Sequence, residues 1–381
     1  MKKVLHIGID SKNFGGIEQL VLEYAKHINK NNNFKIDVLS QSKDNYLFFE
    51  NELKQACSKL YAFNINKLTR KTELIYDYKL FKFLRKNEYD ILHVNSRGFF
   101  WSFKVILIAK LCGIKTIIIH THGVIKVREK IKQVVFNIIN PLFRSMIDKH
   151  LACSKLAGIS LYTENFLKKN ELEVLPNGIY VREYIYNEND RRQYRNMLNI
   201  NENIVYGHIG RFQKTKNHNQ LIDIFYEIQE RQKNSVLILI GDGELMGEIQ
   251  NKVKNLNIHD KVIFLGFRED VNKILNAIDY FIFPSFNEGL GIALIEAQTN
   301  GIPVFCSDTI PPEAKISEKF YTFNLNENCA EIADKICAKK IDLEYRKTAY
   351  QNAISKGYDI NDVCQRLEEI YSETCKEVNH E

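Results

Sequence analysis

Two carboxylates flank the start of a predicted helix in the second half of the chain. Glu288 lies in a loop with Gly289 and Gly291, and Glu296 lies inside the helix that we expect over residues 290–299. Free N–H groups at a helix start attract a phosphate, and the glycines allow a ligand to approach the backbone. A carboxylate accepts hydrogen bonds from two neighbouring hydroxyls, so this loop predicts a site for a phosphorylated sugar. The helix dipole would also stabilise a carboxylate that has no further function, and this alternative stays open.

Two cations follow the first apolar run of the second half. Arg211 comes directly after Gly210, and Lys216 lies five residues further on. A guanidinium is a planar fork and an ammonium is a point charge, and together they suit a diphosphate. The alternative is that both are solvated surface charges. Gly241, after the next apolar run, predicts either a turn beside a nucleotide or a plain strand-to-helix turn.

Two histidines end an apolar run in the first half. If the strand continues, His120 and His122 point to the same side of it. A metal bound by this pair would need a third ligand, and the sequence offers none that we can identify. The eight cysteines contain no C-x-x-C pair, so we expect reduced, mostly buried thiols.

These motifs occur in an order that resembles glycosyltransferase family 4 over nearly the whole chain. The signature is Glu288-x7-Glu296 followed by Asn300-Gly301-Ile302-Pro303-Val304. The chain departs from the family pattern at Tyr180, where the family usually has Asp. The other matching motifs are Gly15-Gly16-x-Glu18, His120-Thr-His122-Gly123, Pro176-Asn177-Gly178-Ile179, Gly210-Arg211-x4-Lys216 and Gly241-Asp242-Gly243.

The resemblance implies a retaining, metal-independent glycosyltransferase of the GT-B fold. This fold has two doubly wound Rossmann-like α/β domains that face each other across a cleft. The implied donor is a nucleotide-sugar, with UDP expected, and the implied acceptor is a polyprenyl-diphosphate-linked saccharide or another glycan of a bacterial capsule or exopolysaccharide. A nucleotide-sugar epimerase of the same fold and a catalytically silent nucleotide-sugar binding module remain alternatives. We expect no cofactor and no metal, because no Asp-x-Asp motif stands in a suitable context.

The resemblance also implies a role for each motif. Arg211 and Lys216 would neutralise the leaving diphosphate, while Glu288 would bind hydroxyls of the donor sugar. Glu296 would bind the ribose, and His122 would lie near the anomeric carbon. The expected catalytic residues are His122, Arg211, Lys216 and Glu288, and the expected donor-binding residues are Gly15, Gly16, Gly210, Arg211, Lys216, Gly241, Glu288, Gly289, Leu290, Gly291 and Glu296.

Three further residues have less defined roles. We expect His120 to be structural, and we expect Ser154 either to cap a helix or to fill a small polar position of the family. Glu313 is a candidate for another acid of the family.

The elements that must position these residues alternate regularly. Apolar, β-branched runs separated by amphipathic stretches are typical of parallel sheets covered on both faces. The expected strands are 4–9, 35–39, 91–94, 116–119, 150–152, 204–208, 236–240, 262–265, 280–283 and 303–306. The expected helices are 17–29, 74–86, 99–112, 217–232, 243–256, 270–277, 290–299 and 360–375.

Charge divides the chain at the boundary that we predict between its domains. Residues 1–182 contain 30 Lys and Arg against 16 Asp and Glu, a net charge of +14, and the remainder has 23 against 31, a net charge of −8. This asymmetry predicts two domains with different partners. Together with the resemblance it implies an acceptor-binding domain over 1–182 and a nucleotide-sugar-binding domain over 183–357. A C-terminal helix over 358–381 would pack back toward the first domain.

The basic first half also carries a basic amphipathic segment. Lys126, Arg128, Lys130 and Lys132 alternate with apolar residues, and Trp101 lies earlier in the same domain. This pattern predicts peripheral contact with an anionic membrane, although a core-facing helix with a solvated basic face would look the same. Asp10 ends the first apolar run too early for a signal peptide, so we expect a cytoplasmic protein on the inner face of the membrane. No nucleic-acid-binding motif is present, and we expect no nucleic-acid partner.

Overall fold

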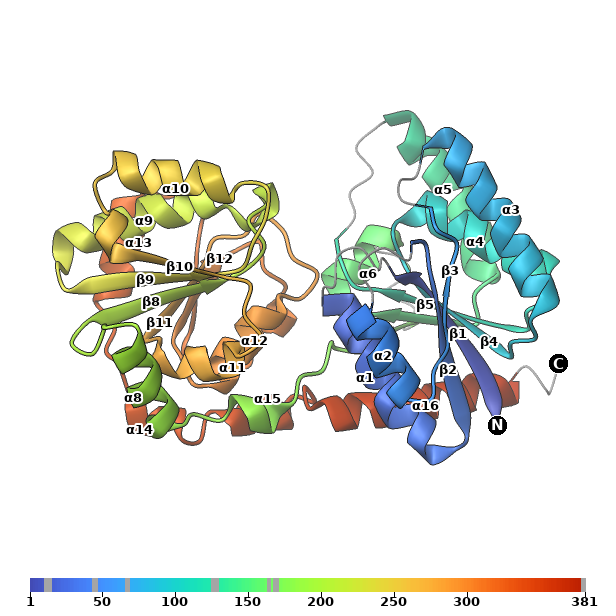
Figure 1. Cartoon of the computed structure of the whole chain (residues 1–381). Coiled ribbons are helices and arrows are strands. Elements are labelled where there is room, and N and C mark those ends of the chain that lie inside the picture. Colours follow the sequence, from blue (N-terminus) through green and yellow to red (C-terminus); the bar gives the residue numbers. More distant parts are fainter. Residues whose placement is uncertain are drawn as a thin grey trace. The chain divides into compact units, whose positions relative to one another are not determined.

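The carboxyl ends of parallel strands define where a site can form in each of the two sheets. The structure is a computed structural model that describes residues 1–9, 16–42, 47–65, 69–124, 130–162, 166 and 171–377. The chain divides into two units, Met1–Gly178 with Ile360–Glu381 and Ile179–Asp359. Each unit has one parallel sheet with helices on both faces, as predicted (Figure 1).

The sheet of the first unit has seven strands in the order β3-β2-β1-β4-β5-β6-β7. Strand order reverses between β1 and β4, and ligands of doubly wound sheets bind beyond the carboxyl ends at such a point. The strands are β1 (Lys2–Ile9), β2 (Phe34–Ser40), β3 (Leu60–Ala62), β4 (Ile91–Asn95), β5 (Thr116–Thr121), β6 (Lys149–Ala152) and β7 (Leu172–Val174).

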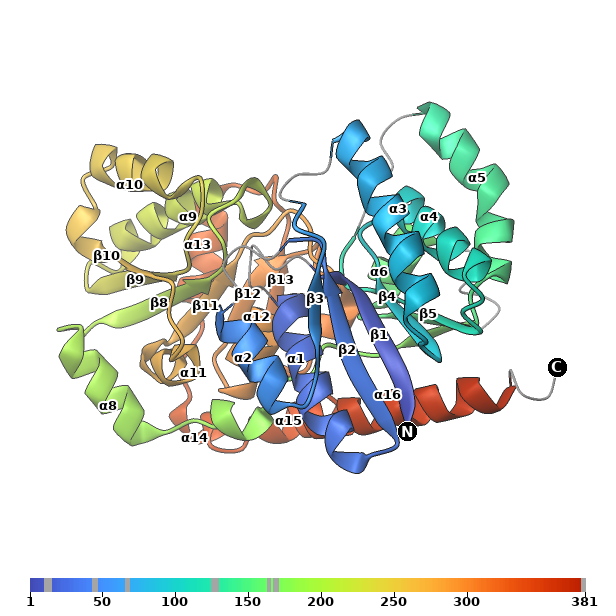
Figure 2. The same cartoon turned by 45° about the vertical axis from the view of Figure 1, so that its right-hand side comes forward.

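Two groups of helices cover this sheet. One face packs against α1 (Gly16–Ile28), with α2 (Leu47–Gln55), and against the C-terminal helix α16 (Ile360–Glu377) (Figure 2). The other face packs against α3 (Arg70–Lys86), α4 (Phe99–Leu111) and α5 (Lys130–Ser145) through a core that includes Leu5, Ile7, Leu92 and Val94. The short helix α6 (Lys155–Leu161) follows β6.

The sheet face toward α16 contains a buried histidine core. The Tyr371 hydroxyl of α16 lies 2.9 Å from both His6 Nε2 and His93 Nδ1, and the two imidazole rings stack with their centroids 4.2 Å apart. His120, which is also fully buried, lies beside His93. Burial lowers the pKa of His6 to about 3 and the pKa values of His93 and His120 well below the ordinary range. These rings are therefore neutral near pH 7 and help to fix α16, which is distant in sequence, on the sheet.

The sheet of the second unit has six strands in the order β10-β9-β8-β11-β12-β13. Strand order reverses between β8 and β11, which makes the carboxyl ends of these two strands the expected ligand position. The strands are β8 (Ile204–Ile209), β9 (Ser235–Ile240), β10 (Val262–Gly266), β11 (Tyr280–Phe283), β12 (Val304–Ser307) and β13 (Phe320–Phe323). Helices α9 (His218–Arg231), α10 (Met246–Asn255) and α13 (Cys329–Cys337) cover one face, and α8 (Glu188–Met197), α11 (Val271–Ile274), α12 (Ile292–Thr299), α14 (Leu343–Arg346) and α15 (Tyr350–Ser355) lie on the other side (Figure 1).

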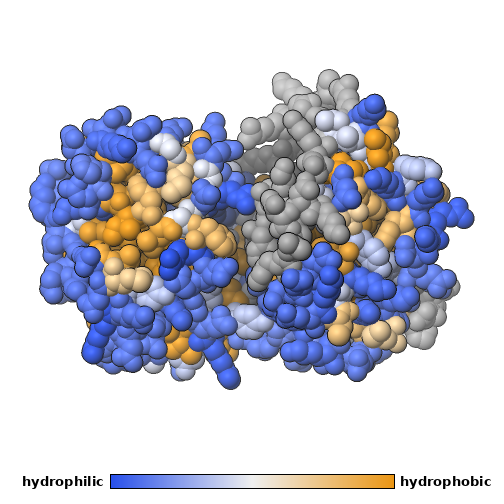
Figure 3. All heavy atoms as spheres, viewed as in Figure 1, coloured by the Kyte–Doolittle hydropathy of each residue, from blue (hydrophilic) through white to orange (hydrophobic). Residues whose placement is uncertain are grey.

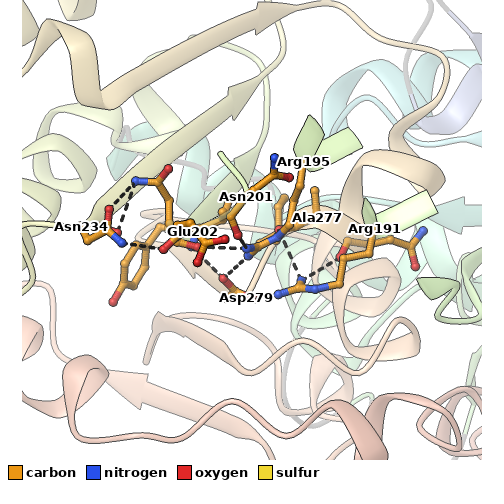
Figure 4. Close-up of polar contacts among 12 residues, drawn as sticks. Arg191, Arg195, Asn201, Glu202, Asn234, Ala277 and Asp279 are labelled. Atoms are coloured by element: carbon orange, nitrogen blue, oxygen red, sulfur yellow. Dashed lines mark hydrogen bonds and ion pairs between the residues drawn. The ribbon is translucent and has the colours of Figure 1, made fainter. Parts of the chain in front are cut away.

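Several cations of the second unit belong to its interior. Arg191 and Arg195 of α8 both pair with the buried carboxylate of Asp279 at the start of β11 (Figure 4). Arg346 is fully buried and donates to the carbonyls of Ile278, Leu275 and Asn300, and burial lowers its pKa to about 9. Removing one member of a buried ion pair typically costs about 3–5 kcal/mol of stability. These arginines are therefore part of the fold and are not free to bind a ligand.

The predicted strands agree with the observed ones within two residues at each end, but three strands were missed. β3, β7 and β13 are short strands at the edges of their sheets and are only partly buried, unlike the equally short interior strand β11. The helix expected over 270–277 is instead α11 followed by a 3-10 turn over Leu275–Ala277. The helices expected from 243 and from 290 begin later, at Met246 and Ile292, because Gly243 and Gly291 have φ angles of +155° and +84°. No described helix is long and apolar enough to span a bilayer.

Candidate functional site

Lys216 and Glu288 meet where the strand order of the second unit reverses. Lys216 ends a 3-10 turn after β8, and its Nζ lies 2.7 Å from Glu288 Oε1 although the residues are 72 positions apart. The ammonium also lies 4.8 Å from the centre of the Phe283 ring, at the end of β11. The two charged side chains are 17% and 13% exposed. The structure thus brings together a cation and a carboxylate that the sequence placed in separate motifs.

The backbone ties the two loops together. The N–H of Phe286, in the loop before α12, donates to the carbonyl of Thr215 at 2.9 Å. Asn217 has a left-handed φ of 53° and turns the chain from Lys216 into α9. Because the Phe286–Thr215 bond joins the loops that carry Lys216 and Glu288, the distance between the loops does not depend on the ion pair alone.

Gly210 and Gly241 stand where neighbouring atoms leave little room for a Cβ atom. A Cβ on Gly241, whose φ is +135°, would lie 2.2 Å from the carbonyl oxygen of Gly210. A Cβ on Gly210 would lie 2.9 Å from His208 Nε2 and 3.3 Å from Lys216 Cδ. Gly241 therefore forms a tight turn against Gly210, which is compatible with both predictions for this residue.

The start of α12 offers backbone N–H groups as hydrogen-bond donors. Gly291 is the N-cap residue of α12, and its carbonyl accepts from Leu294 N at 2.8 Å. The first N–H groups of a helix have no carbonyl partner within the helix, and the helix dipole adds partial positive charge there. The side chain of Leu290 is buried, so its backbone is the part that could serve a ligand. Gly289 lies between Glu288 and Leu290 and is partly buried.

Glu296 is the fifth residue of α12 and has a separate partner. The hydroxyl of Tyr184 donates to Glu296 Oε1 at 2.8 Å, across 112 positions of sequence. Burial raises the pKa of the Glu296 carboxyl, and the hydrogen bond from Tyr184 opposes that rise. The main chain of Tyr184 is held in turn, because its carbonyl accepts from the side-chain amide of Asn300. Sequence reasoning missed Tyr184, since no local pattern links it to α12.

Arg211 differs from Lys216 in its surroundings. Its side chain is exposed and forms no ion pair with any carboxylate in the described ranges. It stands directly after Gly210, at the carboxyl end of β8. Among the described residues, Arg211 is therefore a cation without a counter-charge next to the Lys216 loop, whereas Lys216 already has one.

His122 belongs to the first unit and is held between two asparagines. Its Nδ1 lies 3.0 Å from Asn177 Oδ1, and its Nε2 lies 3.0 Å from Asn95 Oδ1. Burial lowers the pKa of His122 to about 4, so near pH 7 the ring is neutral and carries one proton. The amide nitrogen of Asn95 donates to the carbonyl of Ile7, which leaves its oxygen toward His122 Nε2, while the Asn177 oxygen faces Nδ1. The single proton of the neutral ring therefore serves one of these two oxygens at a time. Asn95 was not identified from the sequence, and Asn177 was noted only as part of the Pro-Asn-Gly turn.

The remaining predicted residues lie elsewhere. Gly16 begins α1, while Gly15 lies outside the described residues, as do Lys126 and Arg128. Ser154 is the N-cap residue of α6 and accepts from Ala157 N. Glu313 lies in the 3-10 turn Pro312–Ala314, and its carbonyl accepts from the Tyr358 hydroxyl. The described part of the chain holds no group of three or more His, Cys, Asp or Glu placed to bind a metal ion.

Comparison with known proteins connects both units to one class of enzyme. The family model described as glycosyltransferase family 4 matches residues 14–183, and the model described as glycosyl transferases group 1 matches residues 190–356. The chain is 25% identical to EpsF of Bacillus subtilis over 380 residues, which are 97% of this chain and 96% of that protein. It is also 25% identical, over 76% of each chain, to the UDP-Gal:alpha-D-GlcNAc-diphosphoundecaprenol alpha-1,3-galactosyltransferase of Escherichia coli.

Solved structures share the arrangement of elements. The crystal structure of Anabaena HepE in complex with UDP matches with a TM-score of 0.78 and 20% identity, over 98% of this chain and 100% of that chain. WaaG, a glycosyltransferase involved in lipopolysaccharide biosynthesis, matches with a TM-score of 0.69 and 16% identity, over 96% and 99% of the two chains.

Proposed function

Because the chain belongs to the glycosyltransferases, with a family 4 domain followed by a group 1 domain, we propose that it transfers a sugar from a UDP-sugar to a lipid-linked or oligosaccharide acceptor. Its two parallel-sheet units have the GT-B fold, as the sequence predicted. The product would be part of a bacterial cell-surface polysaccharide. The relatives and the family models do not favour an epimerase or a silent binding module.

The meeting of Lys216 and Glu288 at the strand reversal of the second unit carries this proposal. The Lys216 ammonium, with the exposed guanidinium of Arg211, would neutralise the diphosphate that leaves the donor. The N–H groups at the start of α12 would bind the same phosphates. Glu288 and Glu296 would accept hydrogen bonds from sugar and ribose hydroxyls, respectively. This assigns donor binding to the second unit and acceptor binding to the basic first unit.

A donor that binds at this site must break the ion pair between Lys216 and Glu288. The two side chains lie 2.7 Å apart and neutralise each other. An arriving diphosphate offers Lys216 a more highly charged partner, and Glu288 is then released to accept from the donor sugar. Binding would thus exchange one charge-assisted contact for two, and only an intact nucleotide-sugar would supply both.

We propose a retaining, metal-independent reaction. The bond between the anomeric carbon and the diphosphate oxygen breaks, and the acceptor hydroxyl forms the new bond on the same face of the sugar. The acceptor proton passes to an oxygen of the leaving diphosphate, so no separate protein base is needed. Cations of the chain would then supply the charge stabilisation that a metal provides in other enzymes. His122 is neutral and is held by Asn95 and Asn177, so we assign it a positioning role near the anomeric carbon.

The first test is a donor and product assay. UDP-sugars should raise the melting temperature of the purified chain more than other nucleotide-sugars do, since a ligand stabilises the native state that binds it. Transfer to a short-chain prenyl-diphosphate-linked saccharide should continue in EDTA and should give a product with the anomeric configuration of the donor. An inverted product or an EDTA-sensitive rate would contradict the mechanism. An epimerised donor formed without acceptor would contradict the proposed function.

We also propose that the first unit docks on an anionic membrane through α3 and α5. The side chains of Val134, Ile138 and Leu142, spaced four residues apart on α5, are 59%, 72% and 57% exposed. Leu74 and Tyr78 of α3 are exposed as well, and the exposed basic residues of α3 are Lys71, Lys79, Lys82, Arg85 and Lys86. Figure 3 shows apolar residues at the surface of this unit next to hydrophilic ones. An apolar stripe flanked by basic residues is suited to an anionic interface.

Charge placed in the α5 stripe should abolish docking. The double variant Ile138→Glu and Leu142→Glu should float at least roughly tenfold less with vesicles of phosphatidylcholine and phosphatidylglycerol, because two carboxylates would enter the anionic interface. The matched control is the double variant Met197→Glu and Phe267→Glu in the second unit, where the replaced apolar side chains are 55% and 69% exposed. The control should float like the unaltered chain. Equal flotation of both double variants, or no flotation of the unaltered chain at low salt, would contradict the proposed docking.

A further inference from the structure

Arg97 occupies the strand reversal of the first unit. It follows β4, and its Nε donates to the carbonyl of Gly8, on β1, at 3.1 Å. Its Nη1 donates to the side-chain oxygen of Gln41, just after β2, at 2.7 Å. The guanidinium also lies 5.5 Å from the centre of the Trp101 ring. Segments from β1, β2 and β4, at the carboxyl edge of one sheet, therefore hold this cation in place.

The guanidinium has no counter-charge in the described part of the chain. Its hydrogen-bond partners are a carbonyl and a neutral amide, and no described carboxylate forms an ion pair with it. Its Nη2 is shielded from solvent and has no partner among the described residues. A partly buried charge that lacks both a counter-charge and part of its hydrogen bonds is costly.

The buried arginines of the second unit are satisfied. Arg191 and Arg195 share the carboxylate of Asp279. Arg346 has no carboxylate partner among the described residues, but each of its three nitrogens donates to an oxygen. Arg144 of the first unit also has a buried nitrogen, Nε, without a partner among the described residues, and its guanidinium lies 5.0 Å from the centre of the Phe166 ring. Arg97 differs from Arg144 because it stands at the strand reversal, the position where a ligand can supply the missing oxygen atoms.

A second unused donor lies next to Arg97. The indole Nε1 of Trp101 is buried and has no partner among the described residues. Gly8 has a φ of +90°, and a Cβ there would lie 1.9 Å from the carbonyl oxygen of Asn95 and 3.3 Å from the Trp101 ring. A glycine is thus required where β1 passes β4 and the indole. The two donors suit an anion with several oxygens, and their position is the one where doubly wound sheets bind ligands.

We propose that Arg97 and Trp101 form a second anion site, which binds the phosphate group of the lipid-linked acceptor. The inference rests on the proposed function for the identity of the acceptor. The ligand chemistry is a phosphate or diphosphate ester, and the residues of this site are distinct from those around Lys216. Arg97 would anchor the acceptor by its diphosphate, while the membrane-facing helices would hold its lipid. A guanidinium binds phosphate oxygens through its N–H groups, and Nη2 has such groups to offer.

The protein contains its own probe for this site. Trp101 is the only tryptophan in the chain, so tryptophan fluorescence reports on the surroundings of Arg97. Inorganic pyrophosphate should change this fluorescence saturably, both in the unaltered chain and in Lys216→Ala, in which the proposed donor site lacks its main cation. Geranyl diphosphate should give the same change at lower concentration, and equal affinities for the two compounds would contradict a prenyl-linked ligand. Sodium chloride at matched ionic strength should give no change.

Substitution of Arg97 decides the proposal. Arg97→Gln should weaken the pyrophosphate response at least roughly tenfold, the usual loss for a charge-assisted hydrogen-bonded pair. Lys216→Ala should leave the response unchanged. An unchanged response in Arg97→Gln, or a response lost in Lys216→Ala, would overturn the assignment. If Arg97→Gln does not fold, Arg97→Lys replaces it, and an affinity equal to that of the unaltered chain would again overturn it.

Kinetics separate this inference from the proposed function. Arg97→Gln should raise the KM for acceptor and leave the KM for donor and the affinity for UDP unchanged. A merely structural arginine would instead change both KM values and the melting temperature. If no transfer is found with any acceptor but pyrophosphate still binds through Arg97, the proposed function fails and the anion site stands.

Discussion

Lys216→Ala should lower kcat for sugar transfer by roughly 10²–10³-fold, the range for removing one group that stabilises developing charge in a transition state. The Lys216 ammonium is braced between Phe283 and Glu288, so it can face a diphosphate without a large rearrangement. Arg211 is exposed and unbraced, and it cannot replace a cation held at a fixed position. Initial rates with saturating donor measure the effect, and affinity for pyrophosphate at the donor site should fall in parallel.

Lys214 provides the matched control for this experiment. It lies in the same 3-10 turn, two residues before Lys216, and its side chain is exposed. Lys214→Ala removes the same charge from the same loop and should change the rate by no more than about twofold, as expected for a surface residue. Comparable losses in both variants would mean that loop charge, rather than the position of Lys216, matters.

A double variant tests the ion pair itself. Lys216→Ala leaves the mostly buried Glu288 carboxylate without its partner, which costs stability. Adding Glu288→Gln should recover part of that loss, because the two residues are in direct contact. Additive losses in the free energy of unfolding would show that the pair contributes nothing in the absence of donor.

Glu296→Gln should weaken UDP binding by roughly 30- to 100-fold, equivalent to about 2–3 kcal/mol for a charge-assisted hydrogen bond. Glutamine keeps the size of the side chain but replaces an acceptor oxygen with a donor, which would face the ribose hydroxyls. Calorimetric titration measures the loss. Pyrophosphate binding should hardly change, because Glu296 is assigned to the ribose and Lys216 to the phosphates.

Two further variants test whether the loss of UDP affinity depends on Glu296 and on its hydrogen-bond partner. Tyr184→Phe removes the hydroxyl that donates to Glu296 and should weaken UDP binding by roughly three- to tenfold, since the carboxylate remains but loses its anchor. Glu344→Gln alters an exposed carboxylate of the same unit and should have no effect. If Glu296→Gln weakens pyrophosphate as strongly as UDP, the ribose assignment is wrong.

Much of the fold could be predicted because its long strands differ chemically from its helices. β9 is apolar from Val236 to Ile240 and is buried along its whole length, while the helix α9 before it mixes polar and apolar residues. Glycines mark the loops after several strands, which located the motifs around Gly210 and Gly291. The strands β3, β7 and β13 were missed because they are edge strands that are only partly buried, whereas the four-residue strands β6, β11 and β12 inside the sheets were predicted.

The partners of the predicted residues could not be found in the same way. Tyr184 lies 112 positions from Glu296, and Asn95 lies 27 positions from His122. Arg97 attracted no attention in the sequence, since a single arginine after a strand is ordinary. Its significance comes from the loops that surround it and from the hydrogen bonds that it lacks among the described residues.

The sequence by itself determined the rhythm of strands and helices, the family, and the loops that carry Lys216, Glu288 and Glu296. These follow from local chemistry, namely apolar runs, turn residues and the spacing of charged groups. Only the tertiary structure decided that Lys216 pairs with Glu288, that His122 is neutral between two asparagines, and that Arg97 lacks a counter-charge among the described residues. The physical reason is that strand order, rather than sequence order, decides which loops are neighbours. β8 lies beside β11 and β1 lies beside β4, so each strand reversal joins residues whose proximity no local pattern encodes.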